Sequence, residues 1–343
     1  MAVFPAKLIP DETTDAGGQG GMRRRVLLAA FPAIGAASRA MAQRSLPVIG
    51  LLSFGKAMVA GFAKVRAGLE ALGLVQGRDF TVTIRDAGGD YSRLPALAAD
   101  LLASRPAVVL LGGHVAAKTL QELSPSTPIV INGMNDPVSA GLVANMFRPG
   151  GNITGVSNMT EAAQARMVEI LREMLPAARR VAVVVNPQND SLQPMLDAFR
   201  RRAVAGGLAV EPVKISHPSE LDTAFGVMGR SRPDALLVVQ DAALQYLAAD
   251  IVLRALARRV PSFGTQLLGF VEAGALFSYA KDTDEAARSV AFLLAKILRG
   301  ARPGDLPIEQ PTQFHLRINL GTARSLGIVV PPSLLAGAYE VVE

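Results

Sequence analysis

Short apolar runs alternate with longer amphipathic segments in the first half of the chain. Such runs, bounded by glycine and polar residues, are typical of buried strands, and a 3.6-residue apolar period is typical of helices packed on a sheet. We predict strands at residues 48–52, 80–85, 108–111, 129–131 and 153–156. We predict helices at residues 59–72, 91–104 and 115–123.

The same alternation continues in the second half of the chain. Strands are predicted at residues 181–185, 210–213, 235–239, 261–263 and 275–279, the last returning to the first lobe. Helices are predicted at residues 160–175, 219–229, 242–257 and 283–299. One more helix is predicted to follow residue 190 and to end at residue 205. Asp282 and Glu285, three residues apart, predict a capping box for the last helix, which Gly300 ends.

This βαβα order predicts parallel sheets with helices on both faces. A chain of 343 residues exceeds one typical domain, so we expect two Rossmann-like α/β lobes. The first lobe is assigned residues 46–157 and 279–308, and the second residues 158–278 and 309–343.

The stretch at residues 128–156 joins a strand to a polar loop. After the strand at 129–131, Asp136 is a suitable N-cap and Pro137 suits the first position of a helix. We therefore predict a helix from about residue 138 to 146, with one apolar stripe. A strand that delivers a polar loop to a helix N-terminus is a common ligand position in open α/β sheets.

Composition narrows the classes of function. Half of the residues are hydrophobic and 5% are aromatic, which indicates an aliphatic core. The net charge of +6 comes from dispersed residues, and no nucleic-acid motif accompanies it, so we expect a solvated surface and no nucleic-acid partner. The absence of cysteine excludes disulfides, thiolate metal sites, a cysteine nucleophile and a lipidated-cysteine anchor.

Residues 1–42 are predicted to be a signal peptide with an N-terminal extension. Three arginines at 23–25 precede an apolar run at 26–37 and the small-x-small sequence that ends at Ala42. We expect cleavage after Ala42, a periplasmic mature protein and no stable membrane anchor. Translation from Met22 is favoured over Met1, and the paired arginines permit either the general or the twin-arginine export route.

Several longer motifs resemble one known family. They are DPVSAGLV with RPGGNITGV, LPAARRVAVVVNPQND, DALLVVQD, FVEAGALFSYAKD and LPIEQPTQFHLRINLGTARSLGIVVPPSLLA, in that order. From about Pro47 to the C-terminus the chain resembles bacterial ABC-transporter substrate-binding proteins, a group that includes tryptophan-binding members. The resemblance implies a type I periplasmic-binding-protein fold, with a multi-strand hinge and a ligand cleft between the lobes.

The same resemblance implies a function without catalysis. We expect the chain to bind a small molecule, such as an amino acid, and to deliver it to an inner-membrane ABC permease with its ATPase. No cofactor or metal is expected. Two alternatives stay open: a ligand-sensing regulatory module of the same fold, and a small-molecule enzyme on a Rossmann-like sheet. The first would need a DNA-binding head, and the common nucleotide-binding and hydrolase motifs that the second would use do not occur in the sequence.

Two carboxylates follow predicted strands, one in each lobe. Asp136 and Asp241 are candidates for opposing ligand contacts across the cleft, and each also suits a helix cap. Gly113 and His114 resemble a glycine-led loop of the family, where backbone N–H groups can hold a carboxylate. An ordinary tight turn is the alternative for that loop.

Other candidates lie in loops that follow strands. Phe54 can stack on a ligand or pack in the core, and Asn186 and Asn189 can bind ligand or stabilise a turn. The remaining expected contacts are Ser53, Asn135 and Thr265. We expect hinge packing for residues 278 and 279, and structural roles for the histidines at 217 and 315.

Overall fold

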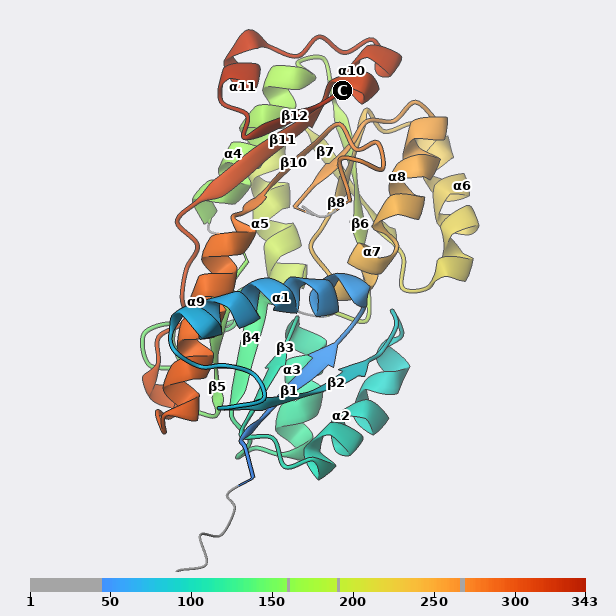
Figure 1. Cartoon of the computed structure of the whole chain (residues 1–343). Coiled ribbons are helices and arrows are strands. Elements are labelled where there is room, and N and C mark those ends of the chain that lie inside the picture. Colours follow the sequence, from blue (N-terminus) through green and yellow to red (C-terminus); the bar gives the residue numbers. More distant parts are fainter. Residues whose placement is uncertain (1–44, 159–160, 190–191, 266–268) are drawn as a thin grey trace, which may run out of the picture. The chain divides into compact units, whose positions relative to one another are not determined.

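The computed structural model describes residues 45–158, 161–189, 192–265 and 269–343 (Figure 1). The predicted signal peptide and its cleavage point lie outside these residues. No helix in the described part of the chain is long and apolar enough to cross a membrane.

The first sheet has five parallel strands in the order β2-β1-β3-β4-β5. They are β1 (Val48–Ser53), β2 (Thr81–Asp86), β3 (Val108–Leu111), β4 (Ile129–Met134) and β5 (Ile153–Ser157). The helices of this lobe are α1 (Lys56–Ala71), α2 (Leu94–Ala103), α3 (His114–Leu123) and α9 (Thr283–Leu298).

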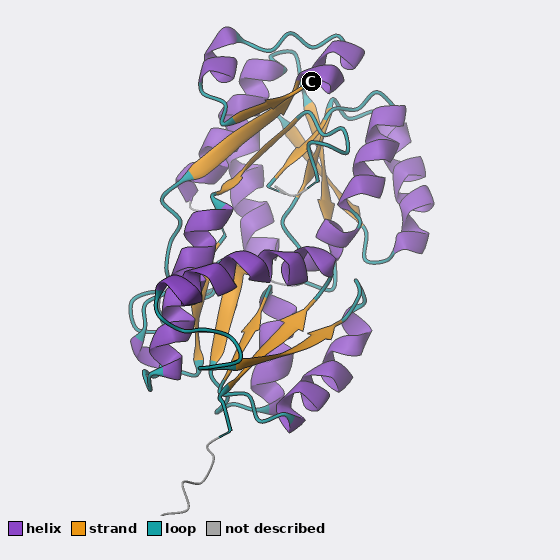
Figure 2. Ribbon diagram, viewed as in Figure 1, coloured by secondary structure: helices purple, strands orange, loops and turns teal. Residues whose placement is uncertain are grey.

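Apolar residues on both faces bury this sheet between helices. Val108 and Leu110 pack in one core cluster with residues of α1 and α9, whereas Val109 and Leu111 pack in another with residues of α2 and α3. Because successive side chains of a strand point to opposite faces, a continuous apolar run such as β3 requires helices on both sides. Figure 2 shows these helices around the strands.

The second sheet has seven strands in the order β12-β11-β10-β9-β8-β6-β7. They are β6 (Arg180–Val185), β7 (Ala209–Lys214), β8 (Ala235–Val238), β9 (Ser262–Gly264), β10 (Phe277–Lys281), β11 (Phe314–Asn319) and β12 (Glu340–Val342). The pair β10 and β11 is antiparallel and the other pairs are parallel. The accompanying helices are α4 (Glu161–Met174), α5 (Leu192–Ala205), α6 (Leu221–Ser231), α7 (Ala242–Tyr246), α8 (Ala248–Ala257), α10 (Leu320–Leu326) and α11 (Pro332–Ala336).

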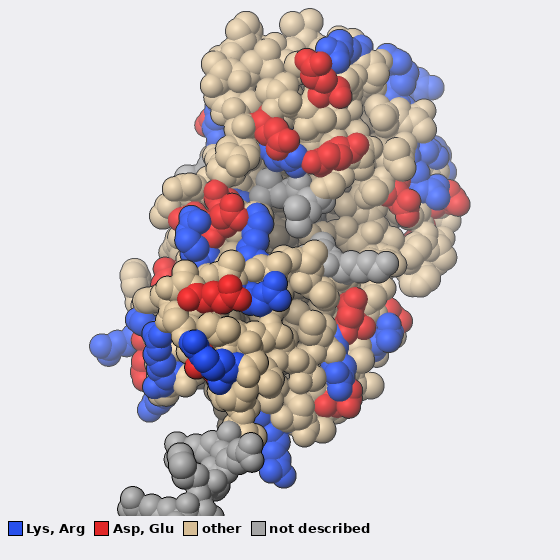
Figure 3. All heavy atoms as spheres, in the orientation of Figure 1, with Lys and Arg blue, Asp and Glu red and all other residues tan. Residues whose placement is uncertain are grey.

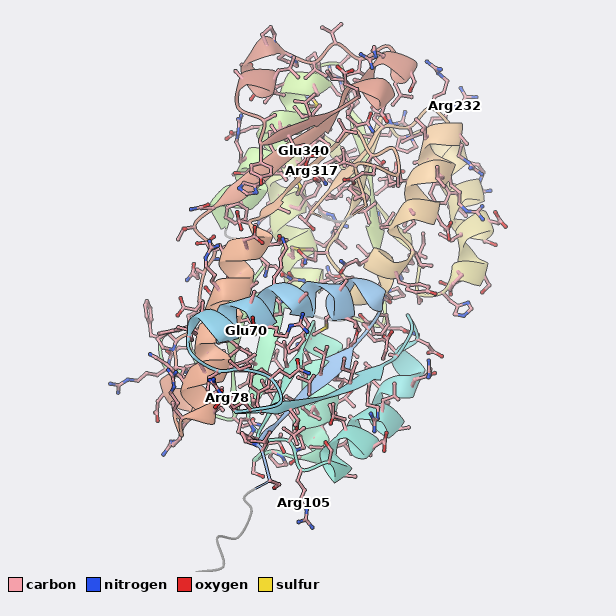
Figure 4. The ribbon with its side chains drawn as sticks, in the orientation of Figure 1. Glu70, Arg78, Arg105, Arg232, Arg317 and Glu340 are labelled. Atoms are coloured by element: carbon pink, nitrogen blue, oxygen red, sulfur yellow. The ribbon has the colours of Figure 1, made fainter. Side chains whose placement is uncertain are left out.

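The C-terminal strands are held by a buried cation. Arg317 on β11 is 8% exposed and bonds to Glu340 of β12 and Glu272, each at 2.6 Å (Figure 4). On the face drawn in Figure 3, basic and acidic side chains are interspersed, as the dispersed charge in the sequence predicts.

The predicted helix at 138–146 is wrong, since these residues form turns. Asp136 accepts a hydrogen bond from Ser139 N at 3.0 Å, so the cap is present. Gly141, at φ 70°, then takes a left-handed conformation, so the turn does not continue into a helix. A second turn follows, in which Asn145 accepts bonds from the N–H groups of Phe147 and Arg148.

The strand predicted to return to the first lobe belongs instead to the second sheet, as β10. The chain leaves that sheet after Lys281, and α9 then packs against α1 and the first sheet. Asp282 caps α9 through the N–H groups of Asp284 and Glu285. The predicted box is half formed, because Glu285 bonds to residues 312 and 313 and not back to the Asp282 N–H.

Candidate functional site

A cavity of about 400 Å³ lies where the loops after β1, β3, β4 and β5 meet loops and helices that follow strands of the second sheet. Parallel strands present their carboxyl ends together, so the loops that follow them converge. The first lobe's loops and α1 contribute Phe54, Gly55, Met58, Gly61, Lys64, Val65, Gly112, Gly113, His114, Asn132, Gly133, Asn135 and Asn158. The other lining residues are Asn189, Gln240, Asp241, Gln245, Tyr246, Lys281, Thr283, Ala286 and Ala287.

Asp241 is buried in this wall and its carboxylate is fully engaged. Its Oδ1 accepts from the N–H groups of Ala243 and Leu244 at 2.9 and 3.0 Å, which caps α7. The same oxygen accepts from Asn186 at 3.1 Å, and Oδ2 accepts from Asn189 at 2.8 Å. Asp241 therefore fixes the two asparagines of the turn after β6, and Asn189 in turn lines the cavity.

Tyr91 joins the first lobe to this carboxylate. Its hydroxyl donates to Asp241 Oδ2 at 2.9 Å, and its ring lies 4.2 Å from the ring of Phe54. Phe54 is 6% exposed and lines the cavity, so it both packs in the core and borders the site. Tyr91 was not predicted as a site residue, because no local sequence pattern shows that a short 3-10 turn reaches the other lobe.

Two asparagines close another part of the wall. The Asn158 side chain donates to Asn135 Oδ1 at 3.0 Å, and Asn135 donates to the carbonyl of Gln240 at 3.4 Å. Asn158 Oδ1 is buried and has no hydrogen-bond partner among the described residues. Gly133, at φ 102°, makes room for it, since a Cβ there would lie 2.3 Å from this oxygen. Asn158 was also not foreseen as a lining residue.

Lys281 brings a positive charge to the cavity. It is 9% exposed, and its Nζ donates to the Ser157 carbonyl at 3.3 Å. Burial lowers its pKa to about 8, although Glu285 opposes the shift. Lys281 was not predicted as a site residue, because it ends a strand that was predicted to finish two residues earlier.

Some predicted site residues lie outside the cavity wall. Asp136 is exposed, and Ser53 uses its hydroxyl to close a turn with Gly55. Asn186 lies behind Asp241, and Thr265 borders a separate, mainly apolar pocket of about 20 Å³. Gly113 and His114 line the main cavity, as expected of a loop after β3.

The residues assigned structural or hinge roles pack away from the cavity. His217 caps a 3-10 turn with Glu220, and the His315 ring stacks on Tyr339 at 3.7 Å. Tyr279 stacks on Phe314 at 5.6 Å, between β10 and β11. No group of His, Asp or Glu in the described ranges is arranged to hold a metal ion.

Comparison with known proteins gives one consistent result. A family described as ABC transporter substrate binding protein matches residues 48–342. A tyrosine-binding protein of Clostridioides difficile (strain R20291) is 23% identical over 266 residues, which are 78% of this chain and 75% of that protein. The structure of an ABC domain in complex with L-Trp from Streptococcus pneumoniae has a TM-score of 0.80 and 25% identity, and covers 87% of this chain and 100% of that chain. A conserved domain protein from Vibrio cholerae has a TM-score of 0.81 at 24% identity, with the same coverage.

Proposed function

Because the chain belongs to the family of ABC transporter substrate-binding proteins, we propose that it captures a small amino-acid-like molecule and delivers it to an ABC permease. The delivery partner is an inner-membrane permease with its ATPase. The tyrosine-binding relative and the L-Trp complex make aromatic amino acids the first ligands to test.

The cavity is the observation that carries this proposal. Its volume of about 400 Å³ lies in the range of small-molecule sites. Its wall combines the amides of Asn135, Asn158 and Asn189, the ammonium of Lys281 and the ring of Phe54. Such a wall suits a ligand with a charged polar end and an apolar body. The loop at Gly113 and His114 completes the proposed contacts.

Binding without chemistry is part of the proposal. The carboxylate of Asp241, the acidic side chain among the lining residues, accepts five hydrogen bonds and is held as a structural anion. Each of its oxygens already accepts at least two donors, so neither is open to take a proton from a ligand. The ligand should therefore be recovered unchanged after incubation.

The place of action follows from the sequence pattern at residues 22–42. A basic, apolar and small-residue order supports export to the periplasm with Gln43 as the first mature residue. N-terminal sequencing of the exported protein tests this step. A mature chain that still starts at Met1 or Met22 would contradict it.

Calorimetry on the mature chain tests the function directly. Titration with the proteinogenic amino acids, beginning with L-tyrosine and L-tryptophan, should give saturable binding of one molecule per chain for at least one of them. Heat signals for none of the amino acids would overturn the proposal. Recovery of the titrated compound by chromatography separates binding from turnover.

A further inference from the structure

Lys281 is the last residue of β10, and its side chain lines the cavity while the residue is 9% exposed. An ammonium group has three N–H donors. One of them reaches the Ser157 carbonyl at 3.3 Å, which is a long bond to a neutral acceptor. Among the described residues, the position therefore holds a buried cation that uses one of its three donors.

No ion pair in the described part of the chain includes Lys281. Glu285 favours its charged form electrostatically, but the Glu285 oxygens accept bonds from Thr312 and Gln313. A buried charge without a partner destabilises the fold. In this protein the destabilising charge belongs to Lys281, which lines the cavity.

The second lysine of the wall is in a different state. Lys64 forms an ion pair with Asp284 at 2.6 Å, donates to Thr283 Oγ1 at 3.0 Å, and its side chain is about half exposed. Its charge is compensated and solvated. Asp241 does not serve as a partner for either lysine, since its oxygens are occupied by Tyr91, two asparagine amides and two backbone N–H groups.

An unused acceptor lies one residue from the carbonyl that Lys281 contacts. Asn158 lines the same cavity, and its Oδ1 is buried and has no partner among the described residues. The cavity wall thus carries a cation at Lys281 and a neutral acceptor at Asn158. A ligand with an anionic group and a neighbouring N–H or O–H donor satisfies both, and a ligand without an anion leaves Lys281 uncompensated.

We propose that Lys281 binds the anionic group of the ligand and thereby restricts the site to acids. The inference rests on the proposed function and adds the chemical class of ligand and the residue that selects it. A carboxylate with an adjacent amino or hydroxyl group is the form that fits. The loop at Gly113 and His114 is the competing position for the anion, and the test separates the two.

Matched compounds test the charge requirement. Binding of L-tyrosine and L-tryptophan is compared by calorimetry with the amines tyramine and tryptamine, the amide L-tyrosinamide, and inorganic phosphate. The acids should bind, and the amines and the amide should bind at least about tenfold more weakly, as expected for a lost charge-assisted hydrogen bond. Phosphate binding that Lys281→Gln abolishes would support the inference, and phosphate binding that this variant leaves unchanged would contradict it.

Substitutions then locate the anion. Lys281→Gln should weaken binding of the acid by about ten- to a hundredfold, because it removes the charge and keeps a donor. Lys281→Arg should retain part of the affinity. Lys296→Gln, an exposed lysine on α9 outside the cavity lining, is the control with the same change of charge and should bind as the parent does. Circular dichroism confirms that each variant is folded.

The outcomes separate this inference from the proposed function. Tight binding of an acid that Lys281→Gln leaves unchanged would overturn the inference, favour the loop at Gly113, and leave the proposed function standing. Equal binding of acid and amine would also overturn it. Binding of no compound at all would remove the proposed ligand class together with the inference.

Discussion

At the scale of single residues, the cavity contrasts two buried charges. Within the described part of the chain, Asp241 accepts five hydrogen bonds and Lys281 donates one long one. A buried charge whose hydrogen bonds are all formed fixes the positions of its neighbours, whereas a buried charge with few hydrogen bonds is stabilised when a ligand of opposite charge binds. We therefore assign Asp241 to the architecture of the site and Lys281 to the ligand.

Substitution of the two aspartates tests the first assignment. Each oxygen of Asp241 accepts at least two donors, so Asp241→Asn points an NH₂ group at other N–H or O–H groups whichever way the amide turns. It should lose on the order of 2 kcal/mol or more in the free energy of unfolding, and binding should weaken. Asp136→Asn is the control, since this exposed residue keeps one oxygen for Ser139 N. Urea unfolding and calorimetry measure both variants, and equal loss of binding in the two would contradict the assignment.

The pH dependence of stability tests the second assignment, that Lys281 is a buried cation available to the ligand. In the folded protein the pKa of Lys281 is about 8, below the value of 10.5 for a free lysine, so the unfolded chain binds more protons between these values. The parent should therefore gain stability as pH rises through this window, and Lys281→Met should lack this gain. At pH 7, Lys281→Met should be more stable than the ligand-free parent by on the order of 2 kcal/mol.

Unfolding curves at several pH values measure this difference. The other titratable or charged groups of the cavity wall are Lys64, His114, Asp241 and Tyr246, and Glu285 acts from α9. These groups are shared by parent and variant, so the difference between the two isolates Lys281. Parallel pH profiles for both proteins would show that the ammonium is not held in a desolvated site.

At the scale of elements, α1 carries one wall of the cavity and depends on close packing against α9. A Cβ added at Gly68 would lie 2.7 Å from the Cβ of Ala291. Real Cβ atoms do not approach so closely, so a larger residue there must separate the helices. The lining residues of α1 would move with it.

Gly68→Ala should therefore destabilise the protein by about 1–2 kcal/mol, because overpacking outweighs the better helix propensity of alanine. Binding should weaken as well. Gly226→Ala on α6 is the matched control: nothing lies within 4 Å of its added Cβ, so it should stabilise by about 0.5–1 kcal/mol. Stabilisation by both substitutions would contradict the close contact of α1 with α9.

The sequence predicted most elements because their signals are local. Apolar runs and amphipathic periods placed the strands of both sheets up to β10 and the main helices. The helix after Asp136 was wrong because a cap and an apolar stripe do not decide propagation when Gly141 turns left-handed. The strand β10 was predicted to return to the first lobe but lies in the second sheet. Its own sequence could not show this, because the partners of a strand depend on the rest of the sheet.

One rule placed several of the predicted residues in the cavity wall. Residues just after parallel strands were expected in the cleft, and Phe54, Asn135, Asn189 and Asp241 line the cavity. The rule missed Tyr91, Lys64, Tyr246 and Lys281, which reach the site through packing between segments distant in the sequence. It also included Asp136, whose turn directs it to solvent.

At the scale of the whole molecule, we propose that ligand binding favours a closed arrangement of the two lobes. Contacts from both lobes exist together only when the cleft is closed, so the ligand shifts that equilibrium by its difference in affinity for the two forms. The chain crossings after β5 and after β10 are the proposed hinges. The Tyr91 hydroxyl bound to Asp241 already connects the lobes without a ligand.

Tyr91→Phe tests this connection. The substitution keeps the ring beside Phe54 and removes one donor to Asp241. The ligand-free variant should populate more open forms, with a larger radius of gyration in small-angle scattering, and affinity should fall by about threefold to tenfold. An unchanged scattering profile together with unchanged affinity would show that the hydrogen bond does not contribute to closure.

A crystal structure of the mature chain with its tightest-binding amino acid tests most directly where the ligand binds. We predict one ligand molecule in the cavity of about 400 Å³, with its carboxylate on Lys281 Nζ and its amino group at Asn158. The apolar body should lie in the remainder of the cavity, which Phe54 borders. Ligand density at another surface, or in the cavity with an uncharged group against Lys281, would contradict it.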